Sequence, residues 1–244
     1  MSSQGETLFG RPPVSGSGDE AQWLSVSDLM AGLMMVFMLI SAGLLQYVLI
    51  ERDRVHEIAV SYQENKKDIY DLLMEEFKED LARWDASIDE EDLSVEFHSP
   101  DVLFGSGQTD IRPEFASLLD NFFPRYADIL LRFRQSIQEV RIEGHTDSVW
   151  AGAETEIEAY FMNMVLSQGR TRSVLNYLLE MEDLEHSRDW LKSTFSAVGF
   201  SSSRLILDEE QQEDRTASRR VAFRIVTNAE EQIAQIIRDL PSAN

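Results

Sequence analysis

The stretch Leu29–Ile50, LMAGLMMVFMLISAGLLQYVLI, decides how this chain is organised. It carries no charged residue, and only Ser41 and Gln46 are distinctly polar. Its length matches the roughly 20 helical residues that are needed to cross a bilayer. Trp23 and Tyr47 lie near its two ends, where aromatic rings favour the headgroup level. The sequence therefore predicts one transmembrane helix.

The residues before this run lack the composition of a cleaved signal peptide. They are rich in Gly, Ser and Pro, and Arg11 is the only basic residue among them, so there is no basic segment of the kind that opens a signal peptide. We expect residues 1–22 to form a flexible tail and residues 23–50 to stay in the membrane. The few basic residues on the two sides do not decide the orientation of the helix.

Asp28 stands at the start of the apolar run, in the string WLSVSDLM. Carboxylates inside a membrane are costly and usually face a partner or a wet pathway. Burial raises the pKa of such a group, so that it can bind and release a proton. The alternative is an interfacial Asp that caps the helix N-terminus, with Ser25 and Ser27 nearby. A single helix cannot form an ion path alone, so the first interpretation requires further membrane helices.

The composition excludes several classes of function. The net charge of −22, from 44 acidic and 22 basic residues, makes nucleic acid an unsuitable partner. The absence of cysteine excludes disulfides, zinc–thiolate sites and a cysteine nucleophile. The four histidines are scattered, so we expect no metal site. No catalytic triad, phosphate-binding loop or supported carboxylate pair is present, and we predict no enzyme activity and no cofactor.

Residues 51–92 are predicted to form a linker that begins with a helix. Residues 51–84 contain neither Pro nor Gly, and their apolar residues recur at helical spacing in a narrow seam. Two interpretations are open. The helix pairs with a second copy as a coiled coil, or it packs on the domain that follows. The acidic stretch Asp85–Asp92 then suggests a boundary.

Residues 93–244 are predicted to form an α/β domain. Strands are expected at Leu93–His98, from Val140 to Glu143, at Phe195–Phe200 and at Arg219–Val226. Helices are expected at Phe115–Phe133, despite Pro124, and over the segments Glu156–Met181 and Glu230–Leu240. Alternating strands and helices favour a layered α/β sandwich in which crossover strands pair in parallel.

Four strings within this region occur in the order of a known family. They are IEGHTDS (Ile142–Ser148), NMVLSQGRTRSV (Asn163–Val174), AVGFS (Ala197–Ser201) and DRTASRRVAFRI (Asp214–Ile225). Together they resemble the OmpA-like peptidoglycan-binding domain, over about the last 150 residues.

The resemblance implies a site for the free amino acid end of diaminopimelate in cell-wall peptides. Asp147 would bind its ammonium and Arg170 its carboxylate, with Asn163 and Arg220 at further matching positions. The chain departs from the family in two places. Extra residues, including Ala151–Ala159, lie between Asp147 and Arg170, and Ser218 replaces an Asn.

The order of tail, Asp-bearing membrane helix, linker helix and OmpA-like domain resembles the B subunit of ion-driven stators, of which the flagellar motor is the best known. The string SVSDLMAGLMMVFMLI is more similar to the B subunit of the Zorya antiphage defence system. The resemblance implies a bacterial inner-membrane protein with a cytoplasmic N-terminus and a periplasmic C-terminal domain. It also implies a second copy of the chain, a surrounding ring of multi-helix A subunits, and proton flow through Asp28.

Two alternatives remain open at this point. One is a flagellar-type stator subunit. The other is a static protein that anchors the inner membrane to peptidoglycan without ion flow, for which Asp28→Asn would be harmless.

Overall fold

The computed structural model describes residues 17–98 and 103–228. The chain divides into two compact units, which comprise residues 1–55 and 56–244. The helix α1 (Ser17–Trp84) contributes residues to both units.

The first unit contains the part of α1 that is suited to a membrane. Within the described residues, one helix is long and apolar enough to span a bilayer, and its candidate span is Val26–Asp53 with a mean hydropathy of 2.3. Large apolar side chains of this span are exposed in the isolated chain, as for Leu29 (74%) and Phe37 (71%). Such a surface requires lipid or other membrane helices around it.

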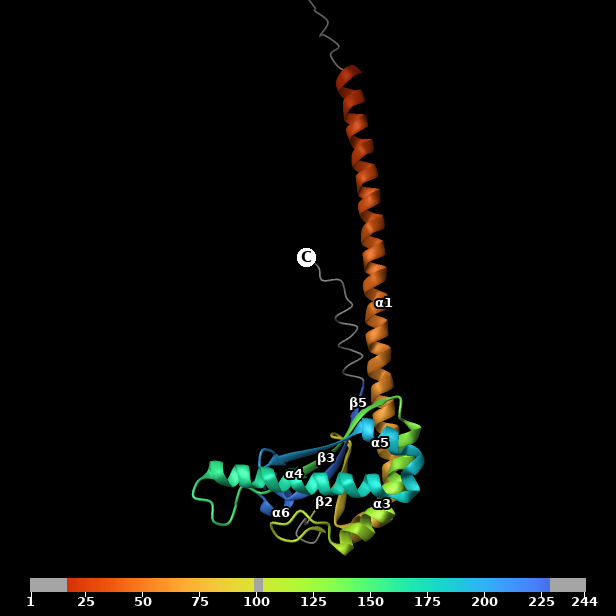
Figure 1. Ribbon diagram of the computed structural model, residues 1–244. Coiled ribbons are helices and arrows are strands. Elements are labelled where there is room, and N and C mark those ends of the chain that lie inside the picture. Colours follow the sequence, from red (N-terminus) through yellow and green to blue (C-terminus); the bar gives the residue numbers. More distant parts are fainter. Residues whose placement is uncertain (1–16, 99–102, 229–244) are drawn as a thin grey trace, which may run out of the picture. The chain divides into compact units, whose positions relative to one another are not determined.

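The second unit, drawn as a ribbon in Figure 1, contains a β-sheet. This sheet has five strands in the order β1-β2-β5-β3-β4. Its strands are β1 (Ala86–Asp89), β2 (Ser94–His98), β3 (Ile137–His145), β4 (Phe195–Ser201) and β5 (Arg220–Thr227). β3 and β4 pair in parallel, and the other neighbours pair antiparallel. The helix α4 (Glu156–Glu180) connects the two parallel strands, as such a crossover requires.

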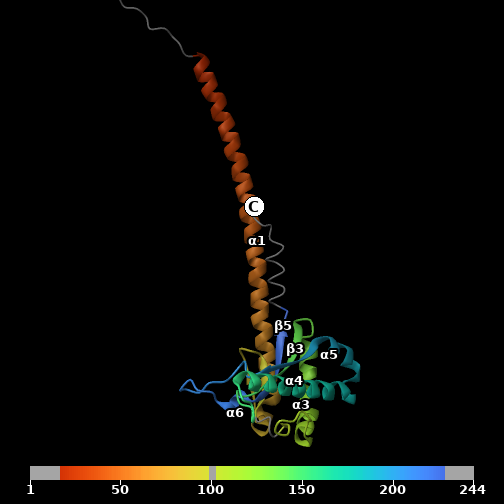
Figure 2. The same cartoon turned by 60° about the vertical axis from the view of Figure 1, so that its left-hand side comes forward.

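Helices cover one face of this sheet. α3 (Pro113–Arg132) and α4 lie on the same side in both views (Figures 1 and 2). Short elements complete the unit: the 3-10 helix η1 (Glu182–Ser187), α5 (Arg188–Thr194) and α6 (Arg215–Ser218). Alternate residues of the central strands, such as Val140 and Ile142 of β3 and Phe223 of β5, are buried against the helices. Their neighbours along each strand point to the opposite face, which is called the open face below.

The hydrophobic core extends back into α1. Ile69, Leu73 and Phe77 are fully buried, and Trp84 is 8% exposed. The ring of Phe77 lies 5.1 Å from that of Phe122 in α3, measured between centroids. This packing favours the second of the two interpretations of the linker helix over residues 69–84, where the apolar seam faces the domain.

The acidic stretch Asp85–Asp92, predicted as a boundary, contains the edge strand β1. β1 and β2 form a hairpin whose register pairs Ala86 with Phe97. Asp85 and Leu93 adopt positive φ angles of 49° and 51° on either side of β1. The sheet therefore begins before Leu93, and the predicted division at that residue does not mark the start of the folded unit.

Most of the other predicted elements are confirmed. β2, α3, α4, β4 and β5 agree with the predicted segments to within about two residues, which is the usual uncertainty of element ends. Pro124 lies inside α3 without ending it. β3 begins at Ile137, three residues before the predicted Val140. The predicted final helix, Glu230–Leu240, lies outside the described residues.

Candidate functional site

Asp28 lies inside α1, near one end of the candidate membrane span. The helix begins at Ser17, so Asp28 is well past its first turn and its side chain cannot cap the N-terminus. The capping interpretation is therefore wrong. The Asp28 side chain is exposed in the described chain, and it stands as a carboxylate on the surface of an apolar helix.

The predicted wall-binding residues depend on close contact between β3 and α4. A Cβ atom added at Gly144 of β3 would lie 2.8 Å from the backbone oxygen of Ser167 in α4. At Gly199 of β4, it would lie 2.5 Å from the backbone nitrogen of Gln168. These two glycines let both parallel strands touch α4, and they fix the height of the helix above the loop that follows β3.

That loop carries Asp147, which is held from two sides. The amide of Asn163 in α4 donates Nδ2–H to the backbone oxygens of Asp147 (3.1 Å) and Val149 (3.2 Å). On the other side, Glu213 accepts from the backbone nitrogen of Ser148 (2.8 Å) and from its hydroxyl (2.5 Å). The structure thus brings Asn163 and Asp147 together, and the loop is positioned before any ligand arrives.

The Asp147 carboxylate forms an ion pair with Arg219, a residue that the sequence analysis did not select. Arg219 Nη1 lies 3.1 Å from Asp147 Oδ2, while the backbone N–H of Val149 donates to Oδ1 at 3.1 Å. The Arg219 side chain is 33% exposed and that of Asp147 is 13% exposed. A negative and a positive group therefore lie side by side at the surface of this loop.

Strand alternation explains why Arg219 reaches Asp147. In RRVAFRIV, the residues Val221 and Phe223 are buried on the helix side of the sheet. Arg219 is an even number of positions before these residues and so points to the same side, whereas Arg220 points to the opposite side. The alternation was visible in the sequence, and it would have indicated Arg219 as the arginine on the side of α4.

Arg170 lies in α4 and is 4% exposed. Its guanidinium donates from Nε to the backbone oxygen of Gln108 (3.0 Å) and from Nη2 to that of Gly105 (3.3 Å). It also lies 5.1 Å from the ring centroid of Phe104. These contacts hold the segment that precedes α3 against α4.

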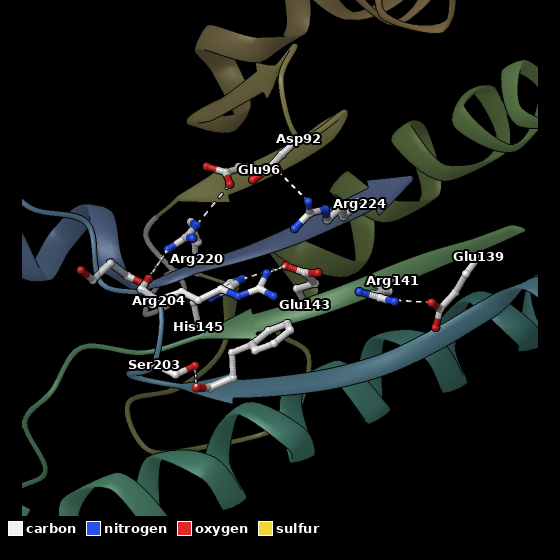
Figure 3. A network of polar contacts seen from close by, with 12 residues as sticks. Asp92, Glu96, Glu139, Arg141, Glu143, His145, Ser203, Arg204, Arg220 and Arg224 are labelled. Carbon is white, nitrogen blue, oxygen red and sulfur yellow. Dashed lines mark hydrogen bonds and ion pairs between the residues drawn. The ribbon is translucent and has the colours of Figure 1, made fainter. Parts of the chain in front are cut away.

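Arg220 points to the open face of the sheet (Figure 3). Its Nε lies 3.2 Å from Glu96 Oε1 of β2, and its Nη1 donates to the backbone oxygens of Arg204 and Ser218. Arg220 is 8% exposed. Its predicted role in wall binding stays a prediction, and its observed contacts join β5 to β2.

The open face also buries a pair of titratable side chains, His145 and Glu143, at the end of β3 (Figure 3). Their side chains are 1% and 4% exposed, and His145 Nε2 lies 3.3 Å from Glu143 Oε2. The His145 ring stacks on Phe200, and the guanidinium of Arg204 covers the same Phe200 ring and lies 3.2 Å from Glu143.

Burial lowers the pKa of His145 despite its hydrogen bond with Glu143. For Glu143, burial would raise the pKa, but the hydrogen bond with His145 and the nearby arginines lower it below its usual value. The pair therefore favours a neutral imidazole beside a carboxylate, with a structural role in joining β3 to the segment after β4.

The stretch Ala151–Ala159, which the resemblance implies to be extra, forms a turn followed by the first turn of α4. Thr155 caps α4 by accepting from the backbone nitrogen of Glu158 at 3.1 Å. Glu158 in return accepts from the backbone nitrogen of Glu154 at 2.8 Å, which is close to a capping box. Residues Glu156–Ala159 are helical, so part of this stretch belongs to α4.

Comparison with known proteins agrees with this architecture. Residues 103–219 match the model of the OmpA family. The Zorya protein ZorB of Escherichia coli is 49% identical over 234 residues, which cover 96% of this chain and 100% of that protein.

Two solved structures are also similar. One is the cell wall anchor of the T6SS from Pseudomonas aeruginosa, with 23% identity and a TM-score of 0.45 over 64% of this chain and 96% of that chain. The other is a putative MotB like protein from Desulfovibrio vulgaris, with 21% identity and a TM-score of 0.45 over 70% of this chain and 94% of that chain.

Proposed function

Because the chain belongs to the family of the Zorya protein ZorB, we propose that it is the B subunit of a proton-driven motor in the bacterial inner membrane, with a role in antiphage defence. In this proposal the N-terminus is cytoplasmic and the OmpA-like domain is periplasmic. Two copies of the chain stand inside a ring of multi-helix A subunits. The observation that carries the proposal is the position of Asp28 within the candidate span of α1.

Asp28 is proposed to carry the proton. A carboxylate on an apolar helix is held away from apolar surfaces by the cost of removing its charge from water. A proton from the periplasm neutralises Asp28, and the neutral side chain then passes an apolar surface of the A subunit. Release of the proton to the cytoplasm restores the charge. Each charge that crosses the membrane supplies about 2.3 kcal/mol per 100 mV, which biases the direction of the step.

The loop around Asp147 is proposed to bind peptidoglycan and keep this subunit fixed while the ring turns. The ligand would be an amino acid end that carries both an ammonium and a carboxylate. Asp147 binds the ammonium, and the guanidinium of Arg219, whose side chain is 33% exposed, binds the carboxylate. Asn163 positions the loop, and Arg170 holds the adjacent segment from its buried position.

The motor proposal is tested by phage plating on cells that carry all genes of the proposed defence system, with Asp28→Asn in this chain. We expect protection to disappear while the protein remains in the membrane at the level of the unchanged chain. Asp53→Asn is the matched control, because Asp53 is a carboxylate at the opposite end of the same span and is paired with Arg52. If protection persists with Asp28→Asn, the ion-carrying role is wrong and the static anchor becomes the better description.

The wall-binding proposal is tested by sedimentation of the protein with purified peptidoglycan. Loss of a charged hydrogen bond costs about 1.5–3 kcal/mol, so we expect Asp147→Ala to weaken retention by roughly 10- to 100-fold. Asp128→Asn changes an exposed carboxylate of α3 and should leave retention unchanged. Equal retention of the unchanged protein, Asp147→Ala and Asp128→Asn would contradict the assignment of peptidoglycan binding to this loop.

A further inference from the structure

An apolar stripe runs along the exposed side of α4 at its N-terminal end. It consists of Ile157, Phe161 and Val165, whose exposed fractions are 71%, 62% and 69%. These residues are four positions apart, so they follow one another along a single side of the helix. Three large apolar side chains in a row at this exposure are unusual on a water-facing surface, and such patches mark interaction sites.

The apolar stripe does not serve the core of its own domain. The buried side of α4 carries Ala159, Asn163, Ser167 and Arg170. At 100° per residue, Phe161 lies on the opposite side of the helix from Asn163. The stripe also starts within Ala151–Ala159, the stretch that the resemblance to the OmpA-like family implies to be extra, and Ile157 lies in the first turn of α4.

We propose that the apolar stripe binds the same stripe of a second copy of this chain, in an antiparallel helix pair centred on Phe161. Ile157 and Val165 lie at equal distances in sequence on either side of Phe161. A two-fold axis between the two copies of Phe161 therefore places Ile157 of each copy against Val165 of the other. This self-complementarity is the requirement for a closed symmetric pair.

The charges around the stripe favour the antiparallel direction. Glu154, Glu156 and Glu158 are exposed at its N-terminal end, and Arg172 is exposed beyond its C-terminal end. An antiparallel pair brings Arg172 within about one helical turn of Glu154 in the other copy. A parallel pair would place the acidic ends together, where like charges repel.

The stripe is small, which fits a tethered pair. From Ile157 to Val165 it extends about 12 Å, and three side chains cannot supply the roughly 800 Å² per partner that a free stable interface buries. Two chains in one membrane complex meet at an effective concentration that reaches the millimolar range. The inference therefore rests on the two-copy arrangement of the proposed function and specifies where the two periplasmic domains touch.

The experiment uses the full-length chain in membranes, which contains no cysteine of its own. A Phe161→Cys variant is treated with a short crosslinker that joins two thiols, because paired helix axes lie about 8–10 Å apart. We expect most of the protein to appear as a covalent dimer. Gln168→Cys is the matched control. It lies on the same side of α4, but in the proposed pair its two copies are about 21 Å apart.

A second measurement does not depend on replacing Phe161. A chain with both Ile157→Cys and Val165→Cys should crosslink to a dimer, whereas either change alone should not. Crosslinking of both single variants to the level of the double variant would contradict the two-fold axis at Phe161.

Copies with different tags are purified from the same membranes to separate the two levels of the proposal. If they co-purify but Phe161→Cys forms no more dimer than Gln168→Cys, the pairing of the stripes is wrong and the two-copy complex stands. If they do not co-purify, the two-copy arrangement itself fails, and the inference fails with it.

Discussion

A fragment that begins at Leu93 should fail to fold, and one that begins at His56 should fold. The shorter fragment contains every segment that resembles the OmpA-like family, but it lacks β1 and the buried part of α1. Ile69, Leu73 and Phe77 are each 0% exposed. Burial of such side chains contributes about 1.5–3 kcal/mol each, so the three together contribute roughly 5–9 kcal/mol. This is comparable with the whole stability of a domain, about 5–15 kcal/mol.

Urea unfolding followed by tryptophan fluorescence and circular dichroism would measure the difference. The fragment from His56 should show one cooperative transition, and the fragment from Leu93 should show none. Within the longer fragment, Phe77→Ala should lower the free energy of unfolding by about 3–5 kcal/mol. Val60→Ala, at a residue that is 41% exposed, should change it by no more than about 0.5 kcal/mol. A cooperative transition of similar midpoint in both fragments would refute the assignment of α1 to the core.

Two further predictions concern β3. Because burial lowers the pKa of His145 in the folded state, the unfolded chain binds a proton more readily, and thermal stability should fall as pH drops below about 6.5. The pKa of Glu143 is also lowered in the folded state, which extends the loss of stability to lower pH. The ionised Glu143 stabilises the folded protein at pH values above its pKa in the unfolded chain, and this stabilisation is lost as the pH falls through its pKa in the folded protein. A His145→Gln variant should lack the first part of this decline in melting temperature, and an unchanged pH profile would contradict the argument. Gly144→Ala should destabilise the domain by about 1–3 kcal/mol, because its Cβ would lie 2.8 Å from the Ser167 oxygen, and a neutral result in urea unfolding would show that α4 can move away.

The membrane helix and most of the sheet could be predicted because their patterns are local. A long run without charge, alternation in β5 and the period of α4 each depend only on neighbouring residues. β1 was not predicted, since a four-residue edge strand within an acidic stretch has only a short alternation and little buried surface. The helical spacing of the apolar residues in α1 predicted an apolar seam, but this spacing does not indicate which surface the seam packs against.

In the candidate site too, some residues could be predicted from local sequence, whereas others depend on how the chain packs. Asp147, Asn163 and Arg170 were found through strings that resemble a family, and the structure gives each a defined set of contacts. Arg219 was missed because Arg220 beside it matched the family position. The choice between two adjacent arginines depends on the face of a strand, and the buried residues that follow them, Val221 and Phe223, decide that face.

The position of Asp28 along its span has an electrical consequence. Asp28 lies near the N-terminal end of Val26–Asp53, which the proposed orientation places at the cytoplasmic side. A proton that reaches it from the periplasm has then already crossed most of the membrane potential. Since 100 mV corresponds to about 2.3 kcal/mol per charge and one pH unit to about 1.36 kcal/mol, each 100 mV acidifies the surroundings of Asp28 by the equivalent of about 1.7 pH units. Voltage and a pH gradient would thus act on the same carboxylate and be interchangeable as its source of energy.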